Sequence, residues 1–407
     1  MSLYGMMRTG GSGMNAQANR LGTVAENIAN ANTTGYKRAS TEFSSLILPT
    51  SNGAYNSGGV ETKVRYSISE QGPTTYTTSG TDLAINGGGF FIVEGANGAN
   101  FLTRAGAFTQ NGDGDLVNSA GYTLMGYEYK EGVDPTVVVN GFDGLKKVNL
   151  ASDGLVAKGS TKGSMGATLN SGDAVGTEST TSLKVFDSQG NARLLDFVYE
   201  KTGPNAWTVE VRDRATYAAP STGVLKTQAL TFDAAGKLTT TPATLTTAAI
   251  SNLPGTGANL GAITIDFTKT QQLGREFTPE AGTIDGSAPS KVAGYQIDKE
   301  GVVYVKYENG TLDPRYRVAL ATVQSPDNLI PQSGNVYSQG VDSGVIITGF
   351  AGSGDFGSIQ SGALEGSNVD IANELTAMIE SQRSYTANSK VFQTGADLLD
   401  VLVNLKR

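Results

Sequence analysis

The sequence predicts a mainly β protein with helical termini, in which the N- and C-terminal helices form an antiparallel coiled-coil core domain. Three observations support this prediction. Apolar heptads occupy both ends of the chain, short apolar or alternating runs between turn residues fill the middle, and the composition changes near residues 150–180. The middle is therefore expected to form two antiparallel β domains, the outer one inserted in the inner.

A stripe of apolar residues predicts the N-terminal helix. Its positions are Met7, Met14, Leu21, Val24 and Ile28. Their heptad spacing is typical of a coiled-coil seam. Five glycines interrupt the segment, each costing about 1 kcal/mol in a helix interior: Gly5, Gly10, Gly11, Gly13 and Gly22. We therefore expect this helix to be stable only when it packs against the C-terminal helix and against neighbouring copies.

The heptad repeat is more regular at the C-terminus. One series recurs every seven residues and a second lies four residues after it. The first comprises Ile371, Met378, Tyr385, Phe392 and Leu399, and the second comprises Leu375, Gln382, Ser389, Ala396 and Val403. Residues 367–370 are interpreted as a capping box that opens the helix. Periodicity alone also allows a helical hairpin within one chain that caps the β domains.

The middle of the chain has the pattern of short strands. Three turns share the form Asp-x-x-Gly, which suits a short hairpin loop; they begin at Asp187, Asp233 and Asp298. No long helical pattern interrupts the runs, and residues 213–262 are too rich in Ala and Thr to assign. The expected strands are 83–85, 90–93, 101–103, 122–127, 183–186, 194–199, 207–211, 263–267, 302–307 and 317–323.

These patterns predict four parts of the chain. Short polar connections at residues 30–54 and 150–182 are the candidates for flexible joints. The parts are a terminal coiled-coil core domain (1–32 and 366–407), a linker (33–70), an inner β domain (71–145 and 275–365) and an inserted outer β domain (146–274).

Composition excludes most catalytic chemistry. The chain has 407 residues with no Cys and no His, which removes disulfides, thiol nucleophiles, Ser-His triads and the usual zinc sites. We therefore expect a protein that is not an enzyme and that uses no metal or cofactor. The net charge is −8, and no basic cluster indicates nucleic-acid binding. The N-terminus lacks the pattern of a cleaved signal peptide.

Two site-like motifs fit structural turns better than ligand sites. Residues 111–115 resemble the start of a calcium loop, but the sixth and twelfth loop positions hold Leu116 and Tyr122 in place of Gly and Glu. The run of glycines at 87–89 lacks the spacing of a nucleotide-binding loop. We interpret the first as a polar hairpin turn and the second as a bulge or a close backbone approach.

Motifs beside the two helices resemble those of the flagellar axial family, which includes rod and hook proteins. The N-terminal motif contains Asn27, Asn30, Asn32, Thr34, Gly35, Tyr36 and Lys37, and the C-terminal motif contains Gln382, Arg383 and Asn388. Residues 82–91 and 101–108 resemble a domain shared by hook and distal rod proteins. Residues 185–191 and 207–211 resemble the hook members alone.

The resemblance implies a subunit exported unfolded through the flagellar type III apparatus and located outside the cell in the hook. Such subunits form a helical homopolymer, a curved, flexible hollow tube that acts as a universal joint and transmits torque from rod to filament. The implied partners are further copies, the distal rod protein, the hook cap or scaffolding protein, the hook-filament junction protein and the hook-length control protein. Within the family, a distal rod subunit is the alternative. In another class, the composition also suits a secreted β-rich carbohydrate-binding protein.

Overall fold

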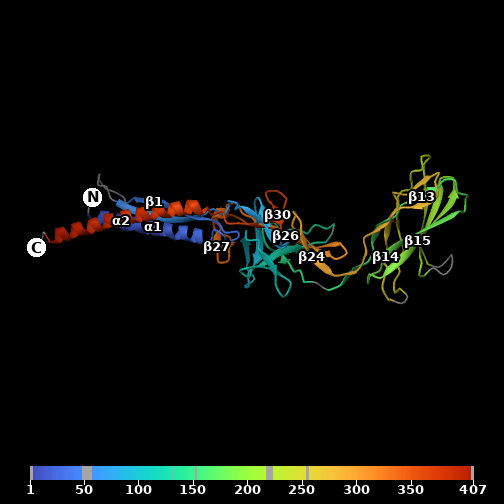
Figure 1. Ribbon diagram of the computed structural model, residues 1–407, viewed down its shortest axis with the longest axis horizontal. Coiled ribbons are helices and arrows are strands. Elements are labelled where there is room, and N and C mark those ends of the chain that lie inside the picture. The colour runs from blue at the N-terminus through green and yellow to red at the C-terminus, as the bar shows by residue number, and fades with distance from the viewer. Residues whose placement is uncertain are drawn as a thin grey trace. The chain divides into compact units, whose positions relative to one another are not determined.

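The computed structural model describes residues 3–47, 57–130, 132–151, 154–216, 223–253 and 256–404 (Figure 1). The chain divides into two compact units. Unit 1 comprises residues 1–151, 294–305 and 312–407, and unit 2 comprises residues 152–293 and 306–311. These limits differ from the predicted 146–274 for the inserted domain, because the strands at 283–290 pair within unit 2.

Two long helices lie side by side in unit 1 (Figure 1): α1 (Leu3–Ala29) and α2 (Ile371–Asn404). They run antiparallel, since Arg20 contacts Glu380 while Asn27 contacts Glu374. The carboxylate of Asp370 accepts hydrogen bonds from the backbone N–H groups of Ala372 (2.9 Å) and Asn373 (3.3 Å). The helix cap is thus the last residue of the predicted capping box rather than Ser367. Neither helix contains a described stretch long and apolar enough to span a membrane.

About half of the predicted linker (33–70), including part of the candidate joint at 30–54, forms an antiparallel β ribbon along α1. It consists of β1 (Ala39–Ile47) and β2 (Ser57–Tyr66), and the part of the predicted joint at 48–56 lies outside the described residues. Ser12 of α1 exchanges two hydrogen bonds with the backbone of Val60, at 2.8 and 2.9 Å. Asn19 donates to the hydroxyl of Thr62 at 2.9 Å. Residues 39–47 and 57–66 are therefore attached to the helix. No pattern in their sequence had indicated this attachment.

A large sheet made of long and short strands forms most of the β part of unit 1. Buried aromatic and aliphatic side chains fill both of its faces, Phe91 and Phe108 on one and Phe90 and Tyr337 on the other. Its strands are β5 (Phe90–Glu94), β6 (Asn100–Thr103), β7 (Phe108–Gln110), β8 (Leu116–Asn118), β9 (Thr123–Glu128), β10 (Lys146–Lys147), β24 (Val292–Ile297), β25 (Val302–Tyr307), β26 (Leu312–Thr322), β27 (Ile330–Gln332), β28 (Val336–Ser338) and β29 (Ile347–Phe350). Beside it lie two small pairs and a short helix: β3 (Thr74–Tyr76) with β31 (Ala363–Glu365), β4 (Leu83–Asn86) with β30 (Ser358–Ser361), and the 3-10 helix η1 (Pro326–Asn328).

The predicted Asp-x-x-Gly turns share one hydrogen-bond pattern. In each, the Asp carboxylate accepts two backbone N–H groups, two and four residues later, at 2.8 to 3.0 Å. The glycine that follows has φ between 79° and 83°. Asn111 makes the same pair of bonds to Asp113 and Asp115. The loop at 111–115 is therefore built as a polar hairpin turn, as the sequence predicted.

Unit 2 has its own hydrophobic core around Trp207, Phe197 and Phe267. One of its sheets is the meander β14 (Glu178–Phe186), β15 (Ala192–Gly203), β16 (Ala206–Asp213) and β17 (Val224–Thr231). The others are formed by β11 (Val156–Lys158) with β23 (Ser287–Ser290); β12 (Lys162–Ser164), β18 (Thr244–Thr246), β19 (Thr264–Asp266) and β22 (Thr283–Ile284); and β13 (Ala167–Asn170), β20 (Gln271–Leu273) and β21 (Thr278–Pro279). All ten sequence-predicted strands fall on strands of the two units.

The prediction of purely antiparallel β domains is wrong for unit 2. Strand β12 pairs in parallel with β19, and β13 pairs in parallel with β20. The two parallel pairs join segments about a hundred residues apart, so neither depends on a tight turn that local sequence could indicate.

Tyr199 in unit 2 gives a prediction for alkaline solution. Its hydroxyl is buried and has no hydrogen-bond partner among the described residues, and burial raises its pKa above the ordinary value. The unfolded chain loses this proton near pH ~10 while the folded unit keeps it. The free energy of unfolding should therefore be unaffected by this group below pH ~10 and should fall above it.

Tyr199→Phe should remove that alkaline loss and should be neutral or stabilising by up to about 1 kcal/mol at neutral pH. Urea unfolding at neutral and alkaline pH, followed by fluorescence of the single tryptophan Trp207, measures both effects. An equally steep alkaline loss in the Phe variant would show that Tyr199 is not its source.

Candidate self-assembly core

The contact between α1 and α2 is built on small side chains. A Cβ added to Gly395 would lie 2.7 Å from Cγ of Met7, and one added to Gly10 would lie 3.2 Å from the carbonyl oxygen of Asn388. Gly13 approaches the side chain of Asn388 in the same way. The helices can approach closely because these glycines have no side chain. Their helix-weakening effect was predicted from the sequence, but their role in packing was not.

The interhelical seam has the predicted period but a different phase. Its buried positions on α2 are Glu374, Ser381 and Gly395, with Asn388 partly buried between them. Each of these four lies three residues after a position of the first predicted series. The seam is polar or small because its partner helix comes too close for large side chains, so hydrophobicity did not mark it.

The predicted apolar series therefore flanks the seam and faces outward. Met378 and Leu399 are partly buried, as are Ser389 and Ala396 of the second series, whereas Gln382 is exposed. Five apolar members are 38 to 62% exposed: Ile371, Leu375, Tyr385, Phe392 and Val403. On α1 Val24 is buried, and Met7, Met14, Leu21 and Ile28 are partly buried. We name the five exposed residues of α2 the apolar stripe.

Asn27 joins α1 to the start of α2 and to the β ribbon. Its amide donates to the carbonyl of Ala39 (2.7 Å) and to the carboxylate of Glu374 (3.1 Å). Its own oxygen accepts from the N–H of Ala39 (2.9 Å) and from the hydroxyl of Tyr36 (3.1 Å). Arg38 completes the group with an ion pair to Glu374 at 2.6 Å. Burial raises the pKa of Tyr36, so its hydroxyl stays protonated as a donor.

A second buried group ties the N-terminal motif to the β part of unit 1. The carboxylate of Glu365 pairs with Lys37 (2.6 Å) and with Arg104 (3.1 Å), and all three side chains are at most 5% exposed. It also accepts the N–H of Gly72 at 3.0 Å. Two cations thus share one anion. Burial lowers the pKa of Lys37, while Glu365 opposes that change.

The remaining motif residues divide into turn formers and surface residues. Asn30 caps the end of α1 through Glu26 and Thr33, and the carbonyl of Thr34 accepts from Asn335 at 3.0 Å. Asn32, Gln382 and Arg383 are exposed. Glu365 and Glu374 were not predicted as site residues. Their side-chain partners lie 261 to 347 residues away, so no local sequence pattern marks them.

Gly22 and Gly35 should respond in opposite ways to substitution by alanine. A Cβ at Gly22 would meet no atom of the described residues within 4 Å, so Gly22→Ala should stabilise unit 1 by about 1 kcal/mol. Gly35 has φ +69°, and its Cβ would lie 2.5 Å from the backbone N of Ala105. Gly35→Ala should therefore cost about 2 kcal/mol or more. Thermal unfolding of the monomer by circular dichroism measures both, and equal effects would contradict this assignment.

Family comparisons agree with this architecture along most of the chain. Four family models match: flagella basal body rod protein (residues 7–37), flagellar hook protein FlgE/F/G D1 domain (84–158), flagellar basal body protein FlaE D2 domain (149–287) and flagellar basal body rod FlgEFG protein C-terminal (360–405). These matches, together with terminal helices that pair with each other and flank the β units in the sequence, define a flagellar axial protein.

The individual relatives identify the branch of this class. The chain is 74% identical to the flagellar hook protein FlgE of Rhizobium meliloti and 47% identical to that of Brucella abortus, in each case over the full length of both chains. It belongs to the flagellar hook protein FlgE family, and it is a structural subunit of the bacterial flagellar hook. Its fold is similar to the crystal structure of Helicobacter pylori FlgE2, with a TM-score of 0.50 and 16% identity, over 70% of this chain and 99% of that one.

Proposed function

We propose that assembly buries the apolar stripe of α2, so that the paired helices form the core of a curved hollow tube. The observation that supports this is the exposure of the stripe along a helix whose seam with α1 is already complete. Large apolar side chains left exposed at intervals along a helix are typical of an interaction site rather than of a finished monomer. Neighbouring copies supply the matching surface in a homopolymer.

The energetics suit a pair of helices that gains part of its stability in the polymer. Full burial of a large aliphatic or aromatic side chain contributes about 1.5–3 kcal/mol. The stripe residues are about half exposed, so each can gain roughly half of that amount when assembly buries it. Five such residues per copy help to offset the entropy lost when a copy joins the tube. Isolated, a glycine-rich α1 has little stability of its own, which also suits export of the unfolded chain through the type III apparatus.

The two units supply the rest of the proposed mechanism. We assign the β part of unit 1 to the inner layer of the tube wall and unit 2 to the outer layer. As the tube rotates while bent, each row of copies must shorten and lengthen, so folded units joined by short connections must slide against their neighbours. A surface with few charges limits the electrostatic barrier to this sliding. In this role the tube transmits torque outside the cell from the rod to the filament.

The proposed partners follow from that position in the flagellum. They are the distal rod protein at one end, the junction protein at the other, and the cap and length-control proteins during growth. Each is inferred from family membership rather than from a surface of this chain.

Electron microscopy of the purified chain tests the proposal. Concentrated protein should form hollow tubes, and amide exchange of residues 371–404 should be faster in the monomer than in the tube. The chain should also restore motility to cells that lack their own hook protein. A chain that stays monomeric at all concentrations and fails in such cells would contradict the proposal.

A further inference from the structure

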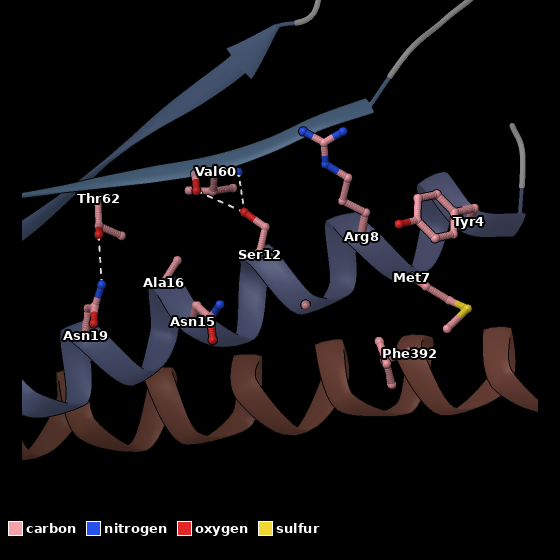
Figure 2. Close-up of a pocket in the computed structure, with 11 residues that line it drawn as sticks. Tyr4, Met7, Arg8, Ser12, Asn15, Ala16, Asn19, Val60, Thr62 and Phe392 are labelled. Atoms are coloured by element: carbon pink, nitrogen blue, oxygen red, sulfur yellow. Dashed lines mark hydrogen bonds between the residues drawn. The ribbon is translucent and has the colours of Figure 1, made fainter.

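A groove lies between the start of α1 and the β ribbon. It has a volume of about 540 Å³ and is lined by α1, by β2 and by Phe392 of α2 (Figure 2). Tyr4 and Met7 supply apolar surface at one end, and Val60 supplies it on the ribbon side. Ser12 and Asn19 are already hydrogen-bonded to β2, so they form a fixed wall.

Arg8 gives this groove a positive charge. Figure 2 shows its side chain extending from α1 beside β2, and the residue is exposed. Within the described part of the chain no ion pair involves Arg8. An occupant that complements the groove therefore combines apolar side chains with a carboxylate.

The end of α2 has this combination of properties. Met7 packs against Gly395 and α1 begins at Leu3, so the last turns of α2 extend beyond α1. Leu402 lies about 10 Å further along the helix axis than Gly395, at 1.5 Å per residue. Leu398, Val401 and Leu402 are each about half exposed. Asp397 is exposed one helical turn before Val401, so the carboxylate borders this apolar surface.

We propose that the end of α2 from a second copy of this chain docks in the groove, with its Asp397 paired to Arg8. A copy cannot fill its own groove in this way, because its α2 passes the groove at Phe392 and then continues beyond α1. The contact joins two different surfaces, so it is heterologous and repeats without closing into a dimer. It rests on the proposed function and adds to it a specific contact between neighbouring copies, in which Phe392 is the one lining residue of the groove that also belongs to the apolar stripe.

A charge exchange tests the pair. Arg8→Glu and Asp397→Arg should each raise the critical concentration for polymerisation about tenfold or more, and the double variant should restore most of the loss. Sedimentation and electron microscopy measure assembly, and circular dichroism confirms that each monomer is folded. Lys226→Glu, an equal charge change on an exposed strand of unit 2, is the matched control and should assemble normally. Asp400→Arg combined with Arg8→Glu should not restore assembly.

The absence of cysteine allows a direct test of proximity. One sample carries Tyr4→Cys and another carries Leu402→Cys, so that a disulfide can join only different copies when they are mixed and assembled. Oxidation should give a cross-linked dimer from this mixture but none from Tyr4→Cys mixed with Lys226→Cys. The docking proposal is overturned if Arg8→Glu assembles like the unmodified chain, if Asp400→Arg rescues as well as Asp397→Arg, or if the first mixture does not cross-link. Failure of the unmodified chain to form tubes would instead contradict the proposed function.

Discussion

Glu365→Gln is expected to lower the free energy of unfolding of unit 1 by about 3–5 kcal/mol. The substitution removes the anion shared by Lys37 and Arg104, whose side chains are buried and ion-paired to it. Two buried cations then face each other without a counter-charge. Urea unfolding followed by far-ultraviolet circular dichroism reports the loss in unit 1. Fluorescence of Trp207, in the core of unit 2, should show an unchanged transition there.

Two matched variants make this expectation specific. Glu42→Gln removes an exposed carboxylate paired with Arg65 and should change stability by less than about 1 kcal/mol. Lys37→Met removes one of the two cations and leaves Arg104 paired with Glu365, so it should cost clearly less than Glu365→Gln. The lowered pKa of Lys37 agrees with this order, because burial already disfavours its charged form. Equal losses from Glu365→Gln and Glu42→Gln would contradict the importance of the buried group.

Leu375→Asp should abolish polymerisation and leave the monomer folded. Leu375 belongs to the apolar stripe and is 47% exposed, so a carboxylate there remains hydrated in the monomer. In the polymer the same charge would be buried without a partner, at a cost that exceeds the contribution of the original contact. Sedimentation and electron microscopy measure assembly, and circular dichroism measures folding.

Phe392→Asp should have the same effect on assembly but a less simple cause, since Phe392 also approaches Gly10 in the monomer. Leu375→Asp is therefore the cleaner variant. Thr227→Asp, on an exposed position of β17, introduces the same charge in unit 2 and should polymerise normally. Normal tubes from Leu375→Asp would show that the stripe is not buried on assembly.

Local sequence patterns predicted the elements whose causes are local. The heptads gave both helices, the alternating runs gave the strands, and Asp187, Asp233 and Asp298 gave turns with the expected hydrogen bonds. These features depend on neighbours within a few residues, so a single sequence contains the necessary information.

Features that depend on distant partners were missed. The phase of the helix seam follows from close approach of Gly10 and Gly13 to Asn388, which apolar periodicity does not encode. The roles of Glu365 and Glu374 require partners from the other end of the chain. The ribbon of β1 and β2 is held by α1 through polar contacts, and the parallel pairs of unit 2 join remote strands. The predicted apolar residues thus lie on the two predicted helices, and the stripe residues of α2 lie beside, rather than in, its contact with α1.

The pairing of β11 with β23 brings the beginning and the end of unit 2 together, with Val156 opposite Ser290. Antiparallel partners of this kind have Cα atoms about 5 Å apart. A foreign domain with neighbouring termini can therefore replace residues between these strands without stretching the chain on either side. The same geometry means that insertions and deletions at this point need not alter α1 and α2, so the chain offers a natural position for displaying other sequences along a tube.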